Sequence, residues 1–111
     1  VWADPGLAGK AKGARSMCNW DEDAVTMAVE AARNCLNARA AWRGQTPAAV
    51  ADPEHAPGAV FLATTTAPFA DRQNAGIVSG ALGLPESIAT LDVTGSQKAG
   101  TGALLQAFGA V

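Results

Sequence analysis

The sequence has no strong excess of charge of either sign. Eight lysines and arginines stand against ten aspartates and glutamates, which gives a net charge of −2 over 111 residues. Proteins that grip nucleic acid through its phosphates usually carry a basic surplus, so that class is disfavoured. The chain also lacks an apolar run long enough to span a bilayer. We therefore expect neither a nucleic-acid partner nor a membrane partner.

Metal-binding and nucleophilic residue types are scarce. The chain has only two cysteines, Cys18 and Cys35, and one histidine, His55. Their spacing does not match a zinc site. Such cysteine use fits a reducing compartment, and we expect two small buried or half-buried thiols in a cytoplasmic protein. A disulfide or a reactive thiol is the alternative, and a lone loop histidine is rarely catalytic.

The amino-terminal stretch, residues 1–20, is rich in glycine, alanine and lysine and shows weak periodicity, so it predicts a flexible start. It lacks a secretory signal and an initiator methionine, so we expect the chain to begin inside a longer reading frame. Lys10, Lys12 and Arg15 lie in this stretch. They are more simply a scattered solvated cluster than a phosphate-binding site.

Residues 21–111 read as helix, strand, helix, strand, helix. Acidic residues at 21–23 begin a helix whose apolar spacing continues to about Trp42. Glu30 and Arg33 fall on its polar face as a solvated pair. The apolar run Ala59–Ala63 predicts a buried parallel strand. This alternation indicates one α/β unit with right-handed crossovers.

The second predicted helix runs from Arg72 to Leu82. Asp71 stands where a helix cap is expected, and Gly83 stands where a helix commonly ends. Two glycines, Gly76 and Gly80, fall inside this helix, where each costs about 1 kcal/mol relative to alanine. We expect close packing against another backbone to offset that cost.

The last strand, predicted at Ser87–Val93, leads through a tight turn into a helix at Ala99–Phe108. This helix is apolar on nearly all faces, which predicts a central helix buried between sheets. A side chain at its start meets free N–H groups and a dipole that favour negative charge, so a cysteine there would be an activated nucleophile. The position holds Gln97. The neighbouring Ser96 does not have the spacing of a Gly-x-Ser-x-Gly elbow.

Three blocks of sequence resemble one known superfamily. Ser96-Gln97-Lys98-Ala99-Gly100-Thr101 resembles the active-site turn of the thiolase superfamily, which ends Ala-Cys-Lys-Ala-Gly-Thr in archaeal-type 3-hydroxy-3-methylglutaryl-CoA synthases. Residues 21–32 resemble the first long helix of those synthases, and residues 60–66, followed by 81–85, resemble a later strand and loop. The blocks follow the family's order, and the nearest branch is that of these synthases and of ketoacyl synthase III.

The resemblance implies an incomplete N-terminal half of a thiolase-like fold, with residues 1–111 as a single partial domain. It places Gln97 at the nucleophile position and Thr65 at the acid/base position, where the synthases carry a glutamate. A threonine hydroxyl cannot replace that carboxyl in proton transfer near neutral pH. We therefore expect this chain alone to be inactive. The resemblance also implies acyl-CoA or acyl-carrier thioesters as substrates of the parent protein, with no covalently bound cofactor and no metal.

Two functions follow from the lost nucleophile. In ketosynthase relatives with glutamine at this position, the site decarboxylates a malonyl-type thioester, and the amide of Gln97 would stabilise the enolate. The alternative is a non-catalytic scaffold subunit of a heteromeric acyltransferase complex. The resemblance further implies a homo- or hetero-oligomer formed along Ile88–Val93. It also implies a partner protein with a zinc ribbon and an oligonucleotide-binding-type (OB) fold.

Overall fold

The computed structural model describes residues 18–45 and 56–110, and its helices and strands alternate in the predicted order. The elements are α1 (Ala24–Trp42), β1 (Ala59–Ala63), α2 (Asn74–Ala81), β2 (Ala89–Val93) and α3 (Ala99–Gly109). Lys10, Lys12, Arg15 and His55 lie outside the described residues. Within the described ranges, no helix is both long and apolar enough to cross a membrane.

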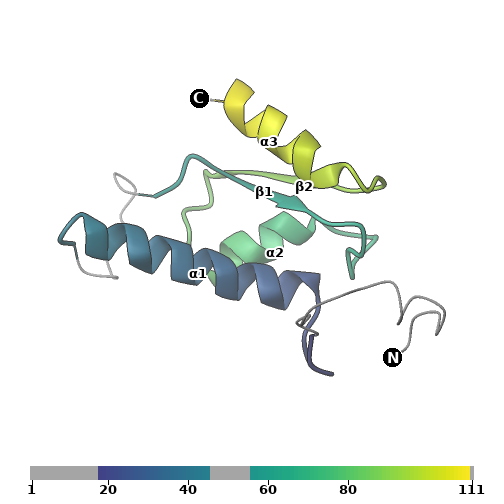
Figure 1. The fold of residues 1–111 in the computed structure, drawn as a ribbon, viewed down its shortest axis with the longest axis horizontal. Helices are drawn as coiled ribbons and strands as arrows, with labels where there is room; N and C mark the ends of the chain where they lie inside the picture. The colour runs from purple at the N-terminus through teal and green to yellow at the C-terminus, as the bar shows by residue number, and fades with distance from the viewer. Residues whose placement is uncertain (1–17, 46–55, 111) are drawn as a thin grey trace, which may run out of the picture.

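The two strands form a parallel pair between two helical layers. Their register runs from Ala59 opposite Ala89 to Ala63 opposite Val93. Helix α2 packs on both strands and α1 packs on α2, whereas α3 contacts both strands from the other face of the sheet (Figure 1). The structure thus confirms an α/β arrangement with parallel strands and packed helices.

The hydrophobic core lies on the α1 and α2 side of the sheet. Val25, Leu62, Ala75 and Val78 are buried there, one or two from each of three elements. Burying a valine or leucine side chain stabilises a fold by roughly 1.5–3 kcal/mol, so this cluster is the main link between the sheet and these helices. Partly buried apolar residues surround it, namely Ala28, Val29, Val60, Ile77 and Leu82.

Helix α1 begins at a capping box built on Asp23. The Asp23 carboxylate accepts from the N–H groups of Val25 and Thr26 at 2.9 and 2.8 Å, and the Thr26 hydroxyl accepts from the Asp23 N–H at 2.8 Å. This cap explains why the helix starts later than the acidic run at 21–23 suggests. Further along, Arg33 pairs with Glu30 at 3.2 Å, as predicted.

Helix α2 departs from the prediction at its start and in the role of its glycines. It begins at Asn74, its N-cap is Gln73, and Asp71 pairs with Arg72 at 3.0 Å instead of capping the helix. Across residues 18–45 and 56–110, no backbone packs closely on Gly76 or Gly80. A Cβ added at Gly80 would meet nothing within 4 Å, and one at Gly76 would meet only the Gln73 side chain.

The predicted burial of the cysteines is also wrong. Cys18 and Cys35 are both free and exposed. Cys35 lies in the later turns of α1, which has 19 residues and packs on an α2 of only 8. A long helix on a short partner leaves much of its surface uncovered.

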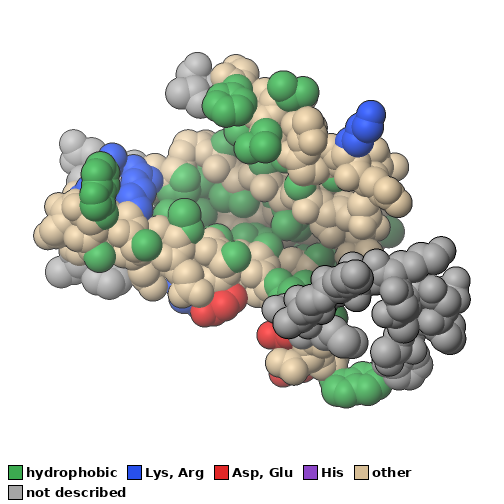
Figure 2. Space-filling view, viewed as in Figure 1, with side chains coloured by type: hydrophobic (Ala, Val, Ile, Leu, Met, Phe, Trp, Pro, Cys, Tyr) green, Lys and Arg blue, Asp and Glu red, His purple; other side chains and the backbone are tan. Residues whose placement is uncertain are grey.

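In the part of the chain that the structure describes, helix α3 is not buried between two layers, which differs from the prediction. Leu104, Leu105 and Phe108 are 61, 69 and 77% exposed, and Ala99 is the buried residue of the helix. Figure 2 shows these hydrophobic side chains gathered at the surface over α3. The described residues place a sheet against one face of α3 only, so its apolar outer face meets solvent.

Candidate functional site

The candidate site lies where the two parallel strands end. One hydrogen bond continues the ladder past the last strand pair, because Thr64 N–H donates to the Val93 carbonyl at 3.1 Å. The segments 64–66 and 94–98 therefore leave the sheet side by side at the carboxyl ends of the strands. In open α/β sheets this is the edge at which ligand sites usually form.

The turn from β2 into α3 depends on Gly95. Its φ is +78°, a backbone conformation that residues other than glycine rarely adopt. The turn is closed by Ser96, because its hydroxyl accepts from the Lys98 N–H at 3.1 Å and its carbonyl accepts from the Ala99 N–H at 3.0 Å. Gln97 stands between these two bonds. It directly precedes the N-cap Lys98 and is exposed.

The threonine segment after β1 is a local hydroxyl turn. Thr66 N–H donates to the Thr64 hydroxyl at 3.1 Å, and the two hydroxyls lie 3.4 Å apart. Thr65 sits at the tip of this turn and is exposed. Its hydroxyl can donate one hydrogen bond and accept others, but it cannot supply a proton as a carboxylic acid does.

The sequence pattern did not single out Asp92, whose carboxylate accepts three hydrogen bonds from the start of α2 near these strand ends. One carboxylate oxygen accepts from the Ala75 N–H at 2.6 Å, and the other accepts from the backbone N–H and the side-chain amide of Asn74 at 2.7 and 2.9 Å. Asp92 thus caps α2, since Gln73 makes no side-chain cap bond. The signal was a charged residue inside the apolar run Leu91-Asp92-Val93, because a half-buried carboxylate requires partners.

The electrostatics of Asp92 follow from these contacts. Partial burial acts to raise the pKa of its carboxyl, but the hydrogen bonds from Asn74 and from the Ala75 N–H outweigh that effect. The pKa of Asp92 therefore lies below its ordinary value, and the group stays charged at neutral pH.

Asn74 and Gln73 connect the start of α2 to its surroundings. Asn74 is 2% exposed, and its amide donates to the Phe69 carbonyl at 2.9 Å while accepting from the Phe69 N–H at 3.2 Å. Gln73 donates to the Thr90 carbonyl at 2.8 Å and accepts from the Thr90 hydroxyl at 2.5 Å. Both side chains tie α2 to segments distant in sequence.

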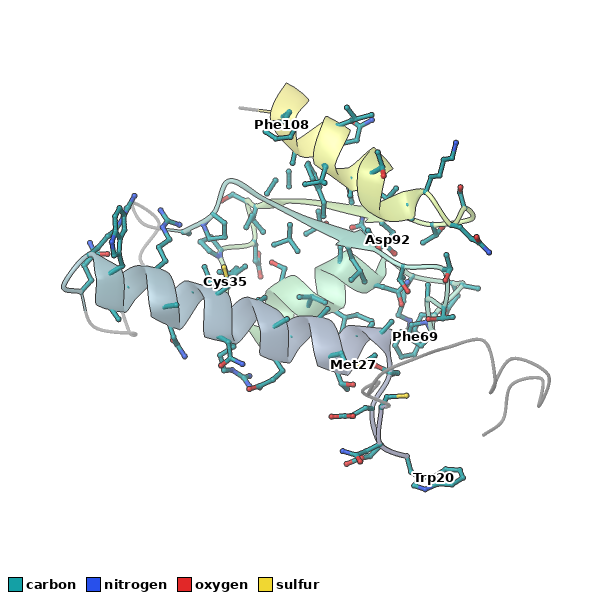
Figure 3. All side chains as sticks on the ribbon, in the orientation of Figure 1. Trp20, Met27, Cys35, Phe69, Asp92 and Phe108 are labelled. Carbon is teal, nitrogen blue, oxygen red and sulfur yellow. The ribbon has the colours of Figure 1, made fainter. Side chains whose placement is uncertain are left out.

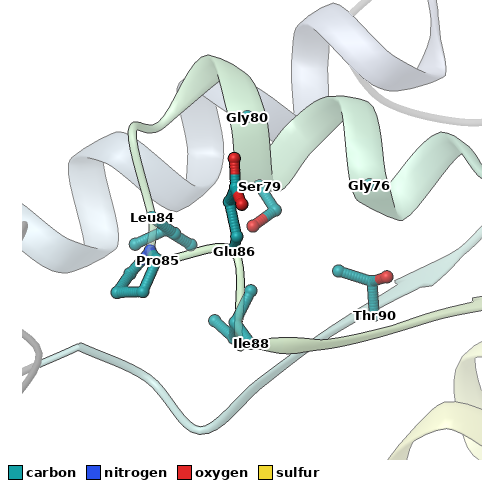
Figure 4. Close-up of a pocket in the computed structure, with 8 residues that line it drawn as sticks. All are labelled: Gly76, Ser79, Gly80, Leu84, Pro85, Glu86, Ile88 and Thr90. Atoms are coloured by element: carbon teal, nitrogen blue, oxygen red, sulfur yellow. The ribbon is translucent and has the colours of Figure 1, made fainter.

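A hollow of about 230 Å³ lies between α2 and β2 (Figure 4). It is lined by Gly76, Ser79, Gly80, Leu84, Pro85, Glu86, Ile88 and Thr90. Its volume is below the roughly 300–1,000 Å³ of small-molecule sites, and neither Gln97 nor Thr65 lines it. In the described ranges, no group of histidine, cysteine and acidic side chains is placed to hold a metal ion.

The fold and this site define a class: an α/β protein with a polar turn at the carboxyl ends of parallel strands, leading into an apolar helix. No protein-family model matches the chain, and no solved structure matches it. Curated sequences do match, and all of those compared below are hydroxymethylglutaryl-CoA synthases.

The matches extend over most of the chain. It is 34% identical over 97 residues to the hydroxymethylglutaryl-CoA synthase of Methanocella arvoryzae, covering 87% of this chain and 24% of that protein. It is 41% identical over 91 residues to that of Pyrobaculum calidifontis, covering 82% and 23%. It is 35% identical over 114 residues to that of Methanosarcina barkeri, covering 100% and 30%.

The chain is therefore related to the hydroxymethylglutaryl-CoA synthases, which confirms the relationship predicted from its three sequence blocks. It spans about a quarter of the length of the curated relatives it matches.

Proposed function

We propose that this chain forms the part of a thiolase-like acyltransferase that carries the nucleophile turn, and that the protein acts on acyl-CoA or acyl-carrier thioesters. In this proposal Gln97 occupies the nucleophile position and Thr65 the acid/base position. The supporting observation is the relationship to hydroxymethylglutaryl-CoA synthases over 82–100% of the chain. The placement of both segments at the same edge of the sheet agrees with it.

The chemistry that fits a glutamine is decarboxylation without an acyl-enzyme. In a malonyl-type thioester the bond to the free carboxylate breaks, CO₂ leaves, and the electron pair forms a thioester enolate that solvent then protonates. The amide of Gln97 would donate to the enolate oxygen, and the nearby amino-terminal end of α3 would add its dipole. Condensation through a covalent acyl group is not expected, because position 97 has no thiol and position 65 no carboxylate.

A scaffold subunit is the second candidate, and the exposed α3 favours it. Among the described residues, Leu104, Leu105 and Phe108 form an exposed apolar face, and β1 is the one strand that pairs with β2. Faces and strand edges of this kind usually pair with another surface. We propose an oligomer formed along Ile88–Val93, with a zinc-ribbon and OB-type protein as a further partner. We also propose a cytoplasmic location, which the two free cysteines support.

The deciding experiment measures CO₂ release from malonyl-CoA by the intact gene product that contains these residues. Gln97→Ala should abolish release, and Gln106→Ala, on the exposed part of α3, is the matched control that should not. If the unaltered protein releases no CO₂ from malonyl-CoA or a malonyl carrier, and native mass spectrometry finds it bound to an active partner subunit, the scaffold function replaces the enzymatic one.

A further inference from the structure

The connection between β1 and α2, residues 64–73, is anchored at two points. At its start, the Thr64 N–H donates to the Val93 carbonyl at 3.1 Å. Further along, the Asn74 side chain binds the backbone of Phe69 at two atoms, accepting from its N–H at 3.2 Å and donating to its carbonyl at 2.9 Å; we call this pair of bonds the bracket on Phe69. The stretch between these two anchors is the hydroxyl turn described above.

The second anchor depends on Asp92. A carboxylate only accepts hydrogen bonds, so the amide nitrogen of Asn74 must face Asp92, and it does so at 2.9 Å. The amide oxygen is then directed to the Phe69 N–H. Asp92 is the charged one of three acceptors on that nitrogen, beside the Phe69 and Arg72 carbonyls at 2.9 and 3.4 Å, so it helps to fix the orientation of the buried Asn74 amide and acts on the loop through that amide. Figure 3 shows Asp92 on β2 beside the start of α2 and Phe69 on the neighbouring loop.

We propose that Asp92 is a positioning residue for the candidate site. Its charge helps to orient the Asn74 amide, that amide holds the backbone N–H and carbonyl of Phe69, and the held loop sets where Thr65 lies beside the turn that carries Gln97. We call Asp92, Asn74 and Phe69 the clamp. The catalytic meaning of the clamp rests on the proposed function, whereas its action on the loop is measurable without any turnover.

If Asp92 were only a helix cap, it would stabilise α2 and leave the loop unaffected. One substitution separates this capping role from the proposed positioning of the loop. Asn74→Ser leaves Asp92 and the backbone N–H groups that it caps, but it removes the bracket on Phe69. Asp92→Asn disturbs both the cap and the orientation of the amide. Val78→Ala is the matched control, because Val78 is buried in α2, 2% exposed, and belongs to the core cluster.

The measurement is amide hydrogen exchange by NMR on the 111-residue chain. Both clamp variants should speed exchange of the Phe69 amide by roughly tenfold relative to the Leu62 amide of β1, since local opening then no longer requires breaking the bracket. They should also shift the Thr65 and Thr66 amide resonances. Val78→Ala should speed exchange throughout and leave those resonances in place.

The result that overturns the proposal is specific. If Asn74→Ser leaves Phe69 exchange and the Thr65 resonance unchanged, Asp92 is only the cap of α2. Equal acceleration of all amides in both clamp variants has the same meaning. If Asp92→Asn does not fold, Asn74→Ser alone decides. A lack of thioester turnover would count against the proposed function and would not alter these exchange rates, so the two proposals fail separately.

Discussion

Both faces of the sheet are covered by helices rich in apolar residues, but the apolar side chains are buried on one face and largely exposed on the other. On one face, α1 and α2 close over Val25, Leu62 and Val78 and exclude water from them. On the other face, α3 rests on the strands, while Leu104 and Phe108 remain exposed. Apolar content is therefore not enough to produce burial; a helix is buried only when something covers its outer side.

The largest effect should come from breaking the closed face. Leu62→Ala removes a buried side chain from the core and should lower the free energy of unfolding by about 2–5 kcal/mol. Leu104→Ala, on the exposed side of α3, should change it by no more than about 0.5 kcal/mol. Urea unfolding followed by circular dichroism measures both. Equal losses for the two variants would show that α3 is also packed in solution.

The pH dependence of stability tests the role of Asp92 on β2, the strand that α2 and α3 contact from opposite faces. The pKa of Asp92 is lowered in the folded protein, so its stabilising contribution is complete above the unfolded value of about 3.9 and is lost as pH falls through the folded value. Asp92→Asn should therefore have a lower free energy of unfolding than wild type at pH 7, and the difference between the two proteins should become smaller at low pH. Urea midpoints between pH 2 and 7 test this. A gap that does not vary with pH would contradict it.

Substitutions in the capping box measure how much the start of α1 contributes to the stability of the face that α1 and α2 cover. Asp23→Ala removes the acceptor for two N–H groups of α1 and should lower the urea midpoint, by less than Leu62→Ala does. Asp21→Ala, in the same acidic run but outside the box, is the control and should leave the midpoint nearly unchanged. Equal shifts for the two would mean that general charge, and not the cap, stabilises the helix.

The smallest effect concerns the open face. A cysteine introduced by Gln97→Cys lies beside the first turn of α3, where the helix dipole favours a thiolate by about 0.3–1 kcal/mol. Its alkylation by iodoacetamide near pH 7 should be roughly two- to fivefold faster than that of Gln106→Cys. Rates are read by intact mass, with Cys18 and Cys35 substituted by serine in both proteins. Equal rates would make the turn merely structural.

The element order and several boundaries could be predicted from the sequence. Strand β1 lies at Ala59–Ala63 as predicted, α1 ends at Trp42, and α3 starts at Ala99. These features depend on local signals, because an apolar run followed by glycine or a polar turn limits the backbone over a few residues. Gln97 and Thr65 were named from a resemblance. The structure adds that their segments leave the sheet at the same edge.

Apart from element boundaries such as the start of β2, which is Ala89 and not Ser87, the wrong predictions concern contacts between distant parts of the chain. Asp71 is a reasonable local cap, yet α2 is capped by Asp92, 17 and 18 residues away from the N–H groups it accepts. Neither the exposure of Cys35 nor that of Phe108 is encoded by the residues next to them. Each depends on whether another layer is present.

The sequence by itself determined which segments become helix or strand, since periodicity and turn chemistry act over a few neighbouring residues. Only the tertiary structure decided which of these segments pack against one another and bury their side chains. A carboxylate such as that of Asp92 finds its partners when the fold brings α2 against β2. The outer side of α3 is exposed to solvent, because a side chain is buried only when another part of the structure packs on it, and a local sequence pattern does not determine that.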